Sequence, residues 1–480
     1  MLNSPHIYIL IVFMLAAGCA TVGPDYKKPT VNIPDAWSKI TSDHLKEGSP
    51  VFKDWWQEFN DPVLPELIKQ ARQANPTLKS AFQRIEIAKF QRGVATSQLY
   101  PTIFFDGASS RIHSSENLIQ PVPQNNPFNN HSYGFASGWE IDFFGAVRRS
   151  IESADANIET SNEAYRDILV SLLSEVALVY IDIRTFEERL RLAQINLETM
   201  RESLNLTRSR FKNGLISELD VRQAESNLAG SQALIPLLTS LRQNNINALA
   251  VLLGTYPVKL EDLLLEPLPI PKPKRDFAIG IPADLLRNRP DIRQAERAIA
   301  AQSAQIGIAT AELYPRFVLF GDFSLQAEST GDLIESSSKA WGFGPSFRWN
   351  IFNAGQVRSL INIEKAITEI AILNYENTVL KAVSEVESSF INISALWDRI
   401  EYKEQQVRAN ARSVVLVNVQ YKQGLVEFQN VLDTERTQIL ADDDLAANKG
   451  ALASNYINLY RALGGGGVLT TTSSSEAPIE

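Results

Sequence analysis

Two stretches of the chain alternate strictly between large apolar residues and small or polar ones. "SYGFASGWEIDFFG" from Ser132 places its aromatic side chains on one face and its glycines, Glu140 and Asp142 on the other, and "KAWGFGPSFRWNIF" from Lys339 repeats the pattern. A period of two over about ten residues predicts strands with one apolar and one polar face, as in a membrane β-barrel. Shorter alternations predict two more strands. The four expected strands span about 102–111, 132–144, 316–327 and 340–352.

Long helical patterns surround these strands. From Val147 to Leu204, apolar or small residues recur every three or four positions with one extra step of four, which is the heptad spacing of a coiled-coil helix with one stutter. The stretch from Gly145 to Asn213 contains no proline. At 1.5 Å per residue it predicts a single helix of roughly 100 Å. The expected helices after the strands are 146–213 and 217–253 in the first half of the chain, and 355–422 and 427–463 in the second.

The second half of the chain repeats the first. "RFKNGLISELDV" begins at Arg210 and "QYKQGLVEFQNV" at Gln420, so the offset is 210 residues. Upstream of a loop that differs in length, the offset is 214, as between Leu99-Tyr100-Pro101 and Leu313-Tyr314-Pro315. Each half therefore has the order helix, strand, loop, strand, long helix, turn, helix. The predicted repeats are 62–254 and 282–464, joined by a proline-rich linker at 255–281.

Four membrane strands are too few to close a barrel. Unpaired backbone groups cost several kcal/mol each in hydrocarbon, and membrane barrels have at least eight strands. The barrel must therefore be assembled from two, three or four copies of the chain. A β-sandwich with one wet face would show the same alternation, but the long flanking helices could not cover its apolar face.

The N-terminus resembles a secretory signal. "IYILIVFMLAAGC" is too short to span a bilayer and has the length of a signal-peptide core, so residues 1–18 are predicted to be removed. Ala16-Ala17-Gly18-Cys19 resembles the bacterial lipobox, which implies lipid attachment at Cys19. Leu15 lies one place further out than usual, so an ordinary signal with an incidental cysteine stays open. Ala20 resembles the signal for sorting to the outer membrane.

Composition excludes several classes of function. The net charge of −9 argues against a nucleic-acid partner. The chain has one cysteine and four scattered histidines, so we expect neither a disulfide framework nor a metal site, and no cofactor. The sequence contains no P-loop, dinucleotide fingerprint or nucleophile elbow. An enzyme is therefore not expected.

Together these features resemble the TolC-like outer membrane factors, in particular their lipoprotein branch (OprM, CusC and NodT-type). The resemblance rests on Cys19 with the "VGPDYKKP" that follows, on "WWQEFNDPVLPELI" from Trp55, on the duplicated plan and on the repeated Gly-Leu turns. It implies a mainly α fold with membrane β: a homotrimer whose twelve-stranded β-barrel continues into a twelve-helix α-barrel. It also implies an equatorial domain, built in part from residues 19–61 and 255–281, and we expect the tail at 465–480 to be disordered.

The resemblance further implies a function. The chain would be the outer-membrane exit duct of a tripartite efflux system, lipid-anchored, with its tunnel projecting into the periplasm. It would passively conduct drugs or other small toxic compounds. The implied partners are outer membrane lipid, a periplasmic adaptor (membrane fusion) protein and an inner-membrane pump of the RND type. Alternatives are a duct for type I protein secretion, a heavy-metal efflux duct and a periplasmic coiled-coil scaffold without a pore.

The repeated turns are the implied periplasmic tip, where the tunnel closes and the adaptor docks. Gly214 and Gly424 supply the backbone freedom of a tight helix-helix turn. The expected docking residues are Phe211, Asn213, Gly214, Leu215, Tyr421, Gln423, Gly424 and Leu425.

Gate residues are implied by the same resemblance. Asp220 and Tyr421 match family gate positions, although Asp220 could simply complement a helix N-terminus. The family's gate arginine, shortly after the second glycine, is replaced here by Val426. "ADDDL" from Ala441 could form an acidic ring or be a solvated helix face.

Overall fold

The computed structural model describes residues 21–31, 37, 45–47, 54–115, 117, 125–261, 264, 266–273, 277–279 and 288–465. The expected signal peptide, Cys19 and the tail from residue 466 lie outside the described residues. The chain divides into two compact units. Unit 1 takes its residues from 1–30, 84–162 and 294–375, and unit 2 takes the rest. Each unit therefore draws on both repeats.

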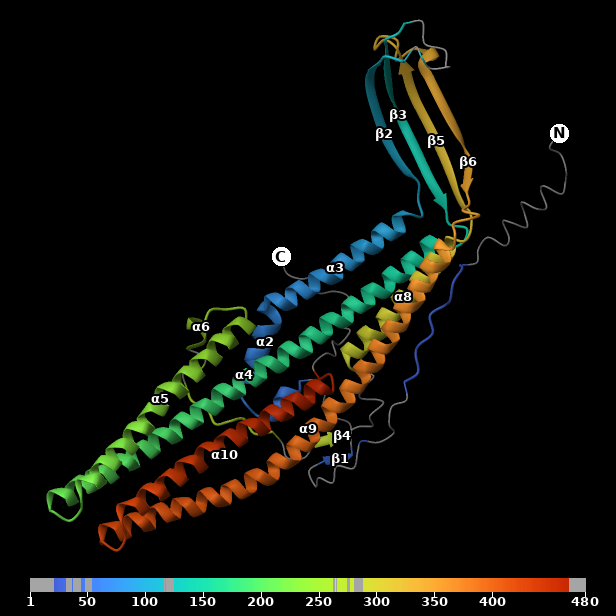
Figure 1. Ribbon diagram of the computed structural model, residues 1–480. Coiled ribbons are helices and arrows are strands. Elements are labelled where there is room, and N and C mark those ends of the chain that lie inside the picture. Colours follow the sequence, from blue (N-terminus) through green and yellow to red (C-terminus); the bar gives the residue numbers. More distant parts are fainter. Residues whose placement is uncertain are drawn as a thin grey trace. The chain divides into compact units, whose positions relative to one another are not determined.

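Unit 1 contains a four-stranded antiparallel sheet in the order β2-β3-β5-β6 (Figure 1). Each repeat contributes one hairpin, and β3 pairs with β5 to join the two. The strands are β2 (Thr102–Ile112), β3 (Phe128–Ile141), β5 (Arg316–Ala327) and β6 (Lys339–Arg348).

The sheet register carries the predicted alternation across all four strands. Phe105 pairs with Phe135, Phe135 with Phe323, and Phe323 with Trp341, so one row of aromatic residues crosses the sheet. Directly paired residues share a face. Phe343, two residues beyond Trp341, is on the same face, and these two rings are 77% and 69% exposed. The aromatic face is therefore not covered as it would be in a sandwich.

The strand ends differ from expectation in β3, which also ends at Ile141 rather than near residue 144, and in β6. β3 begins at Phe128 rather than near residue 132, because its first residues pair with the end of β2, Phe128 opposite Ile112. β6 ends at Arg348 rather than near residue 352, because Arg348 already pairs with Arg316, the first residue of β5. The indole N–H of the next residue, Trp349, donates instead to the Leu313 carbonyl at 3.0 Å.

The junction between helix and strand is built the same way in both repeats. α3 (Pro76–Ser97) precedes β2, and α8 (Pro290–Ala311) precedes β5. The Trp139 indole donates to the Leu99 carbonyl at 2.9 Å, which repeats the Trp349 contact with Leu313. These contacts join each repeat's second strand to the end of the helix before its first strand.

Unit 2 is built from helices of both repeats. α2 (Leu64–Ala74), α5 (Glu218–Leu252) and α10 (Phe428–Ala462) lie in it, with the later parts of the 67-residue helices α4 (Ala146–Lys212) and α9 (Gln356–Lys422). α5 continues through Pro236. Short elements complete the unit. They are β1 (Leu45–Glu47), η1 (Trp55–Phe59), α6 (Val258–Glu261) and β4 (Phe277–Ile279), and β1 pairs in parallel with β4.

A large aromatic and aliphatic core holds unit 2 together. Trp55 from η1 stacks on Tyr460 from α10 with ring centroids 5.1 Å apart, and both are buried. The Tyr180 hydroxyl on α4 donates to the Asp61 carboxylate at 2.9 Å, and Asp61 also accepts the backbone N–H of Leu64 at the start of α2. One carboxylate thus ties the start of a short helix to a long one.

Candidate functional site

Both helical hairpins of unit 2 turn through the same capping motif (Figure 1). Gly214 has φ 72° and Gly424 has φ 75°, both in the left-handed region. Gly214 N donates to the Phe211 carbonyl at 2.8 Å, and Leu215 N to that of Arg210 at 3.0 Å. The α9–α10 turn repeats this pair of bonds. This is the Schellman arrangement, in which glycine avoids the Cβ penalty of a left-handed residue. The glycines therefore act as helix caps.

The two turns expose most of the predicted docking residues. Leu215 is 65% and Leu425 is 69% exposed, and Phe211 is 43% exposed. Asn213 and Gln423 are also exposed. The duplicated motif thus presents one bare leucine at each turn. Tyr421 differs from the others, because only 1% of it is exposed.

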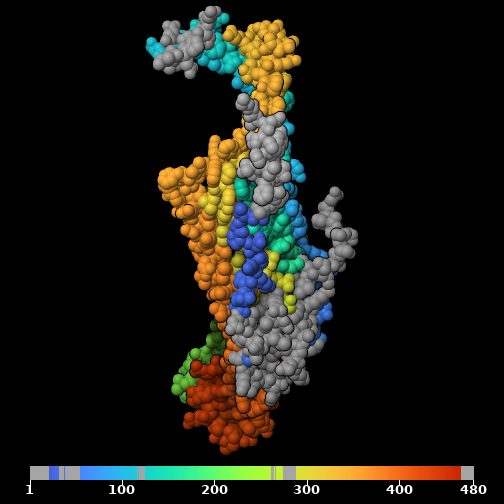
Figure 2. Space-filling view, turned by 90° about the vertical axis from the view of Figure 1, so that its right-hand side faces the viewer, coloured from blue at the N-terminus to red at the C-terminus, as the bar shows by residue number. Residues whose placement is uncertain are grey.

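Tyr421 lies in a cluster that joins the two hairpins. It packs with Phe428 of α10 at a ring-centroid distance of 5.4 Å. The cluster contains residues of α4, α5, α9 and α10: Leu204, Val221, Ala224, Val417, Tyr421, Phe428 and Val431. Figure 2 shows the orange and red atoms of α9 and α10 as one continuous surface, with green atoms of the first repeat beside it. Burial in this cluster raises the pKa of Tyr421.

Arg210 connects the first hairpin to Tyr421. Its guanidinium donates to the backbone carbonyl of Tyr421, and its Cζ lies 4.5 Å from the centroid of the Tyr421 ring. An added Cβ on Gly424 would be 3.6 Å from Arg210 Nη2, so the guanidinium also lies against the second turn. This contact was not predicted from the sequence, because the gate arginine implied by the family resemblance would lie near Val426. The repeat alignment held a signal, since it places Arg210 opposite Gln420, the neighbour of Tyr421.

Asp220 makes a capping contact at the start of α5. Its Oδ2 accepts from Ser217 N at 3.1 Å and from Ser217 Oγ at 3.2 Å. This is the reciprocal half of a capping box. The Asp220 charge also raises the pKa of Tyr421, although less than burial does. The structure thus places the two implied gate residues in different hairpins of unit 2, and it gives Asp220 a capping contact.

The acidic run on α10 makes ion pairs between helices. Asp443 pairs with Arg189 of α4 through two hydrogen bonds of 2.6 and 3.0 Å. Asp444 pairs with Lys403 of α9 at 2.7 Å and with Arg399 at 3.2 Å. These side chains hold α10 against α4 and α9, so the run is more than a solvated face.

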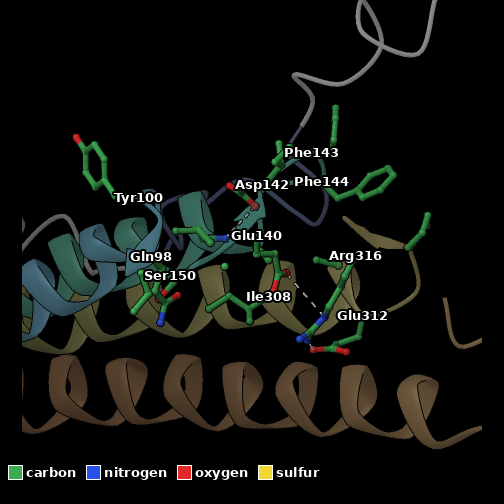
Figure 3. A pocket seen from close by; sticks show the side chains of 17 residues that line it. Gln98, Tyr100, Glu140, Asp142, Phe143, Phe144, Ser150, Ile308, Glu312 and Arg316 are labelled. Atoms are coloured by element: carbon green, nitrogen blue, oxygen red, sulfur yellow. Dashed lines mark hydrogen bonds and ion pairs between the residues drawn. The ribbon is translucent and has the colours of Figure 1, made fainter. Parts of the chain in front are cut away.

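A pocket of about 600 Å³ lies in unit 1, where β3 meets α4 and α8 meets β5 (Figure 3). Its charged groups are already paired. Arg316 lies between Glu312 and Glu140, and Asp142 accepts the backbone N–H groups of Val147 and Arg148 at 3.1 and 3.0 Å. Asp142 therefore caps α4. Among the residues that the structure describes, no cluster of ligating side chains could hold a metal ion.

Within the same described ranges, no helix is long and apolar enough to cross a membrane.

Comparison with known proteins gives a consistent result. The family model described as "Outer membrane efflux protein" matches residues 67–255 and 281–465. The chain is 28% identical over 456 residues to Nodulation protein T of Rhizobium leguminosarum bv. trifolii, covering 94% of this chain and 96% of that one. It is 27% identical over 463 residues to the probable efflux pump outer membrane protein TtgC of Pseudomonas putida, covering 95% of each.

Solved structures of outer-membrane channels have the same fold as this chain over most of its length. The outer-membrane channel OprN superposes with a TM-score of 0.85 at 33% identity and covers 93% of this chain and 100% of that one. CusC, described as forming a transmembrane channel, superposes with a TM-score of 0.79 at 25% identity over the same shares of the two chains.

Proposed function

We propose that this chain, which belongs to the outer membrane efflux protein family, closes its duct at the two helical hairpins of unit 2 and docks its partner there. The duct itself follows from the family: the chain is an outer-membrane efflux channel with a tunnel on the periplasmic side. The predicted fold class, mainly helical with four membrane strands in a trimeric channel, is confirmed. The family is one of efflux channels rather than enzymes.

Closure rests on one observation: Tyr421 is buried where all four helices of the hairpins meet, and Arg210 holds it from the other hairpin. A group that packs two hairpins together opposes their separation, and its removal lets them move apart. Asp220 contributes through its charge near Tyr421 and through the cap of α5.

Docking rests on the bare leucines. Leu215 and Leu425 are exposed apolar side chains on glycine-capped turns, repeated within the chain and so presented six times by a trimer. We infer that a periplasmic adaptor (membrane fusion) protein binds here with small apolar pockets. Phe211, Asn213 and Gln423 would surround the leucines. The adaptor would connect the duct to an inner-membrane pump of the RND type.

Cross-linking tests the docking surface. Replacing Leu215 or Leu425 by a photoreactive residue should capture the adaptor in cells, whereas the same replacement at exposed Leu237, on α5 well away from the turns, should not. Equal capture at Leu237, or none at either turn, would overturn the docking proposal.

The names of the relatives support a proposal for the cargo class. Several are described as outer membrane proteins of antibiotic, toluene or solvent efflux pumps in Pseudomonas putida. We therefore propose that this duct carries drugs or other small toxic compounds. Heavy-metal efflux and type I protein secretion are the alternatives. Deleting the gene should sensitise cells to solvents or antibiotics. Unchanged sensitivity, with loss of an exported polypeptide or of metal tolerance, would favour one of the alternatives.

We also propose that Cys19 carries a lipid anchor. Cys19 itself lies outside the described residues, but the segment that follows is fixed near the strand-helix junction. Val22 N donates to the Phe144 carbonyl at 3.1 Å, and Arg149 Nε donates to the Val22 carbonyl at 3.1 Å. Mass spectrometry of the mature N-terminus should show acylation that is absent from Cys19→Ser. An unmodified Cys19 would contradict the anchor.

A further inference from the structure

Glu225 on α5 and Glu435 on α10 occupy the same position in the two repeats, 210 residues apart. Glu225 is well paired. It accepts hydrogen bonds from Arg208 at 2.8 Å and from Arg222 at 2.9 Å, and these bonds hold its pKa below the usual value. The first hairpin thus keeps this carboxylate charged at its surface.

The second repeat lacks both arginines. The positions of Arg208 and Arg222 are held there by Asn418 and Leu432. Glu435 is 3% exposed, and its Oε1 has no hydrogen-bond partner among the described residues. A buried carboxylate without a cationic partner is costly, so such a group prefers to keep its proton. Desolvation raises the pKa of Glu435 to about 7.

Glu435 lies on the same face of α10 as residues of the cluster around Tyr421. Phe428, Val431 and Glu435 follow each other at steps of three and four, so they lie on one face of α10. Phe428 and Val431 belong to the cluster around Tyr421. The Glu435 carboxyl therefore occupies the next position on the apolar face of α10 that contains Phe428 and Val431.

Among the described residues, the side chains that affect the pKa of Glu435 carry no charge. Ser203 faces it from α4 and Asn418 from α9, and both slightly favour its ionised form. On α5, the residues of the neighbouring cluster around Tyr421 are Val221 and Ala224, and both are uncharged. On α10 itself, the nearest charged residues, Asp433 and Arg436, are exposed. Within the part of the chain that the structure describes, no cation near Glu435 replaces the arginines of the first repeat.

We propose that Glu435 makes the α9–α10 hairpin responsive to protons: the protonated carboxyl packs against α4 and α9, and the carboxylate loosens that packing. The functional meaning, a tip that opens more readily when Glu435 is ionised, rests on the proposed gate. The surface pair at Glu225 should have no such effect, because its charge is already compensated.

The direction with pH follows from linkage. A carboxyl with a higher pKa in the packed state than in the exposed state binds its proton more tightly when packed. Packing is therefore strongest below the ordinary value of 4.5, weakens as the pH rises towards about 7, and is weakest above that.

Hydrogen exchange of the detergent-solubilised full-length trimer tests the proposal. After correction for the intrinsic rate, amides of α10 near Glu435 should exchange roughly thirtyfold faster at pH 8 than at pH 5.5. The bound proton stabilises the packed state by about a factor of ten for each pH unit below the packed-state pKa of about 7. Glu435→Gln, a neutral side chain of the same shape, should remove the difference and keep the slow rate. Glu225→Gln should retain the wild-type difference.

Two results would overturn the role of Glu435: equal corrected rates at both pH values in the wild type, or a pH difference that survives in Glu435→Gln. Conductance of the same trimers in planar bilayers separates this proposal from the gate. If exchange responds to pH through Glu435 while conductance does not, the proton response stands and the gate at these hairpins fails.

Discussion

The two helical hairpins of unit 2 have the same backbone conformation at their turns, but they place their polar side chains differently. Both end their long helix with the same glycine cap and expose a leucine. In the first hairpin, charged groups form pairs at the surface, such as Glu225 with Arg222. In the second, Tyr421 and Glu435 are buried. Duplication thus preserved the turn, while divergence placed two buried polar side chains, Tyr421 and Glu435, in the second hairpin.

The two hairpins should differ most when Tyr421 is replaced. Tyr421→Ala removes a ring that is almost fully buried in the cluster between the hairpins, and such changes cost about 3 kcal/mol or more. Phe211→Ala changes the corresponding residue of the first repeat, which is exposed, and should cost much less. Hydrogen exchange across α9 and α10 measures both. Similar protection in the two variants would show that the hairpins are equivalent.

A smaller effect is expected at Arg210. Arg210→Ala removes the stacking on the Tyr421 ring and the hydrogen bond to its carbonyl, together worth about 1–2 kcal/mol in a half-buried setting. Gln420→Ala, at the corresponding and exposed position, is the matched control. Local exchange of the second turn should accelerate only in Arg210→Ala. If the two variants behave alike, the contact between hairpins contributes little.

The glycines should give the smallest difference between the hairpins. Gly214→Ala and Gly424→Ala each force a Cβ into the left-handed region, at about 1–2 kcal/mol. The added Cβ meets no atom within 4 Å at Gly214 and only Arg210 Nη2, in ordinary contact, at Gly424. Thermal unfolding of the trimers should therefore show equal losses. A much larger loss at one glycine would mean that the turn has a role beyond capping.

Much of the fold could be predicted from the sequence because its patterns are long and repeated. Alternation over Ser132–Ile141 and the heptads after Val147 each extend over many residues, so local irregularities average out. The exact strand ends could not be predicted. β6 ends at Arg348 because β5 begins at Arg316, and pairing between strands far apart in sequence leaves no local signal.

The site was less predictable for a related reason. Capping by Gly214 and exposure of Leu215 are local and followed from the motif. The contact of Arg210 with Tyr421 joins residues 211 positions apart, and the burial of Glu435 depends on three helices. For Glu435, the sequence signal was the comparison of the two repeats, which shows Asn418 in place of Arg208.

Single-channel conductance of the reconstituted trimer tests the central claim most directly, namely that the buried cluster around Tyr421 closes the duct. We expect low conductance for the wild type and for Phe211→Ala, and a several-fold higher conductance for Tyr421→Ala. High conductance in the unmodified trimer, unchanged by Tyr421→Ala, would contradict the account.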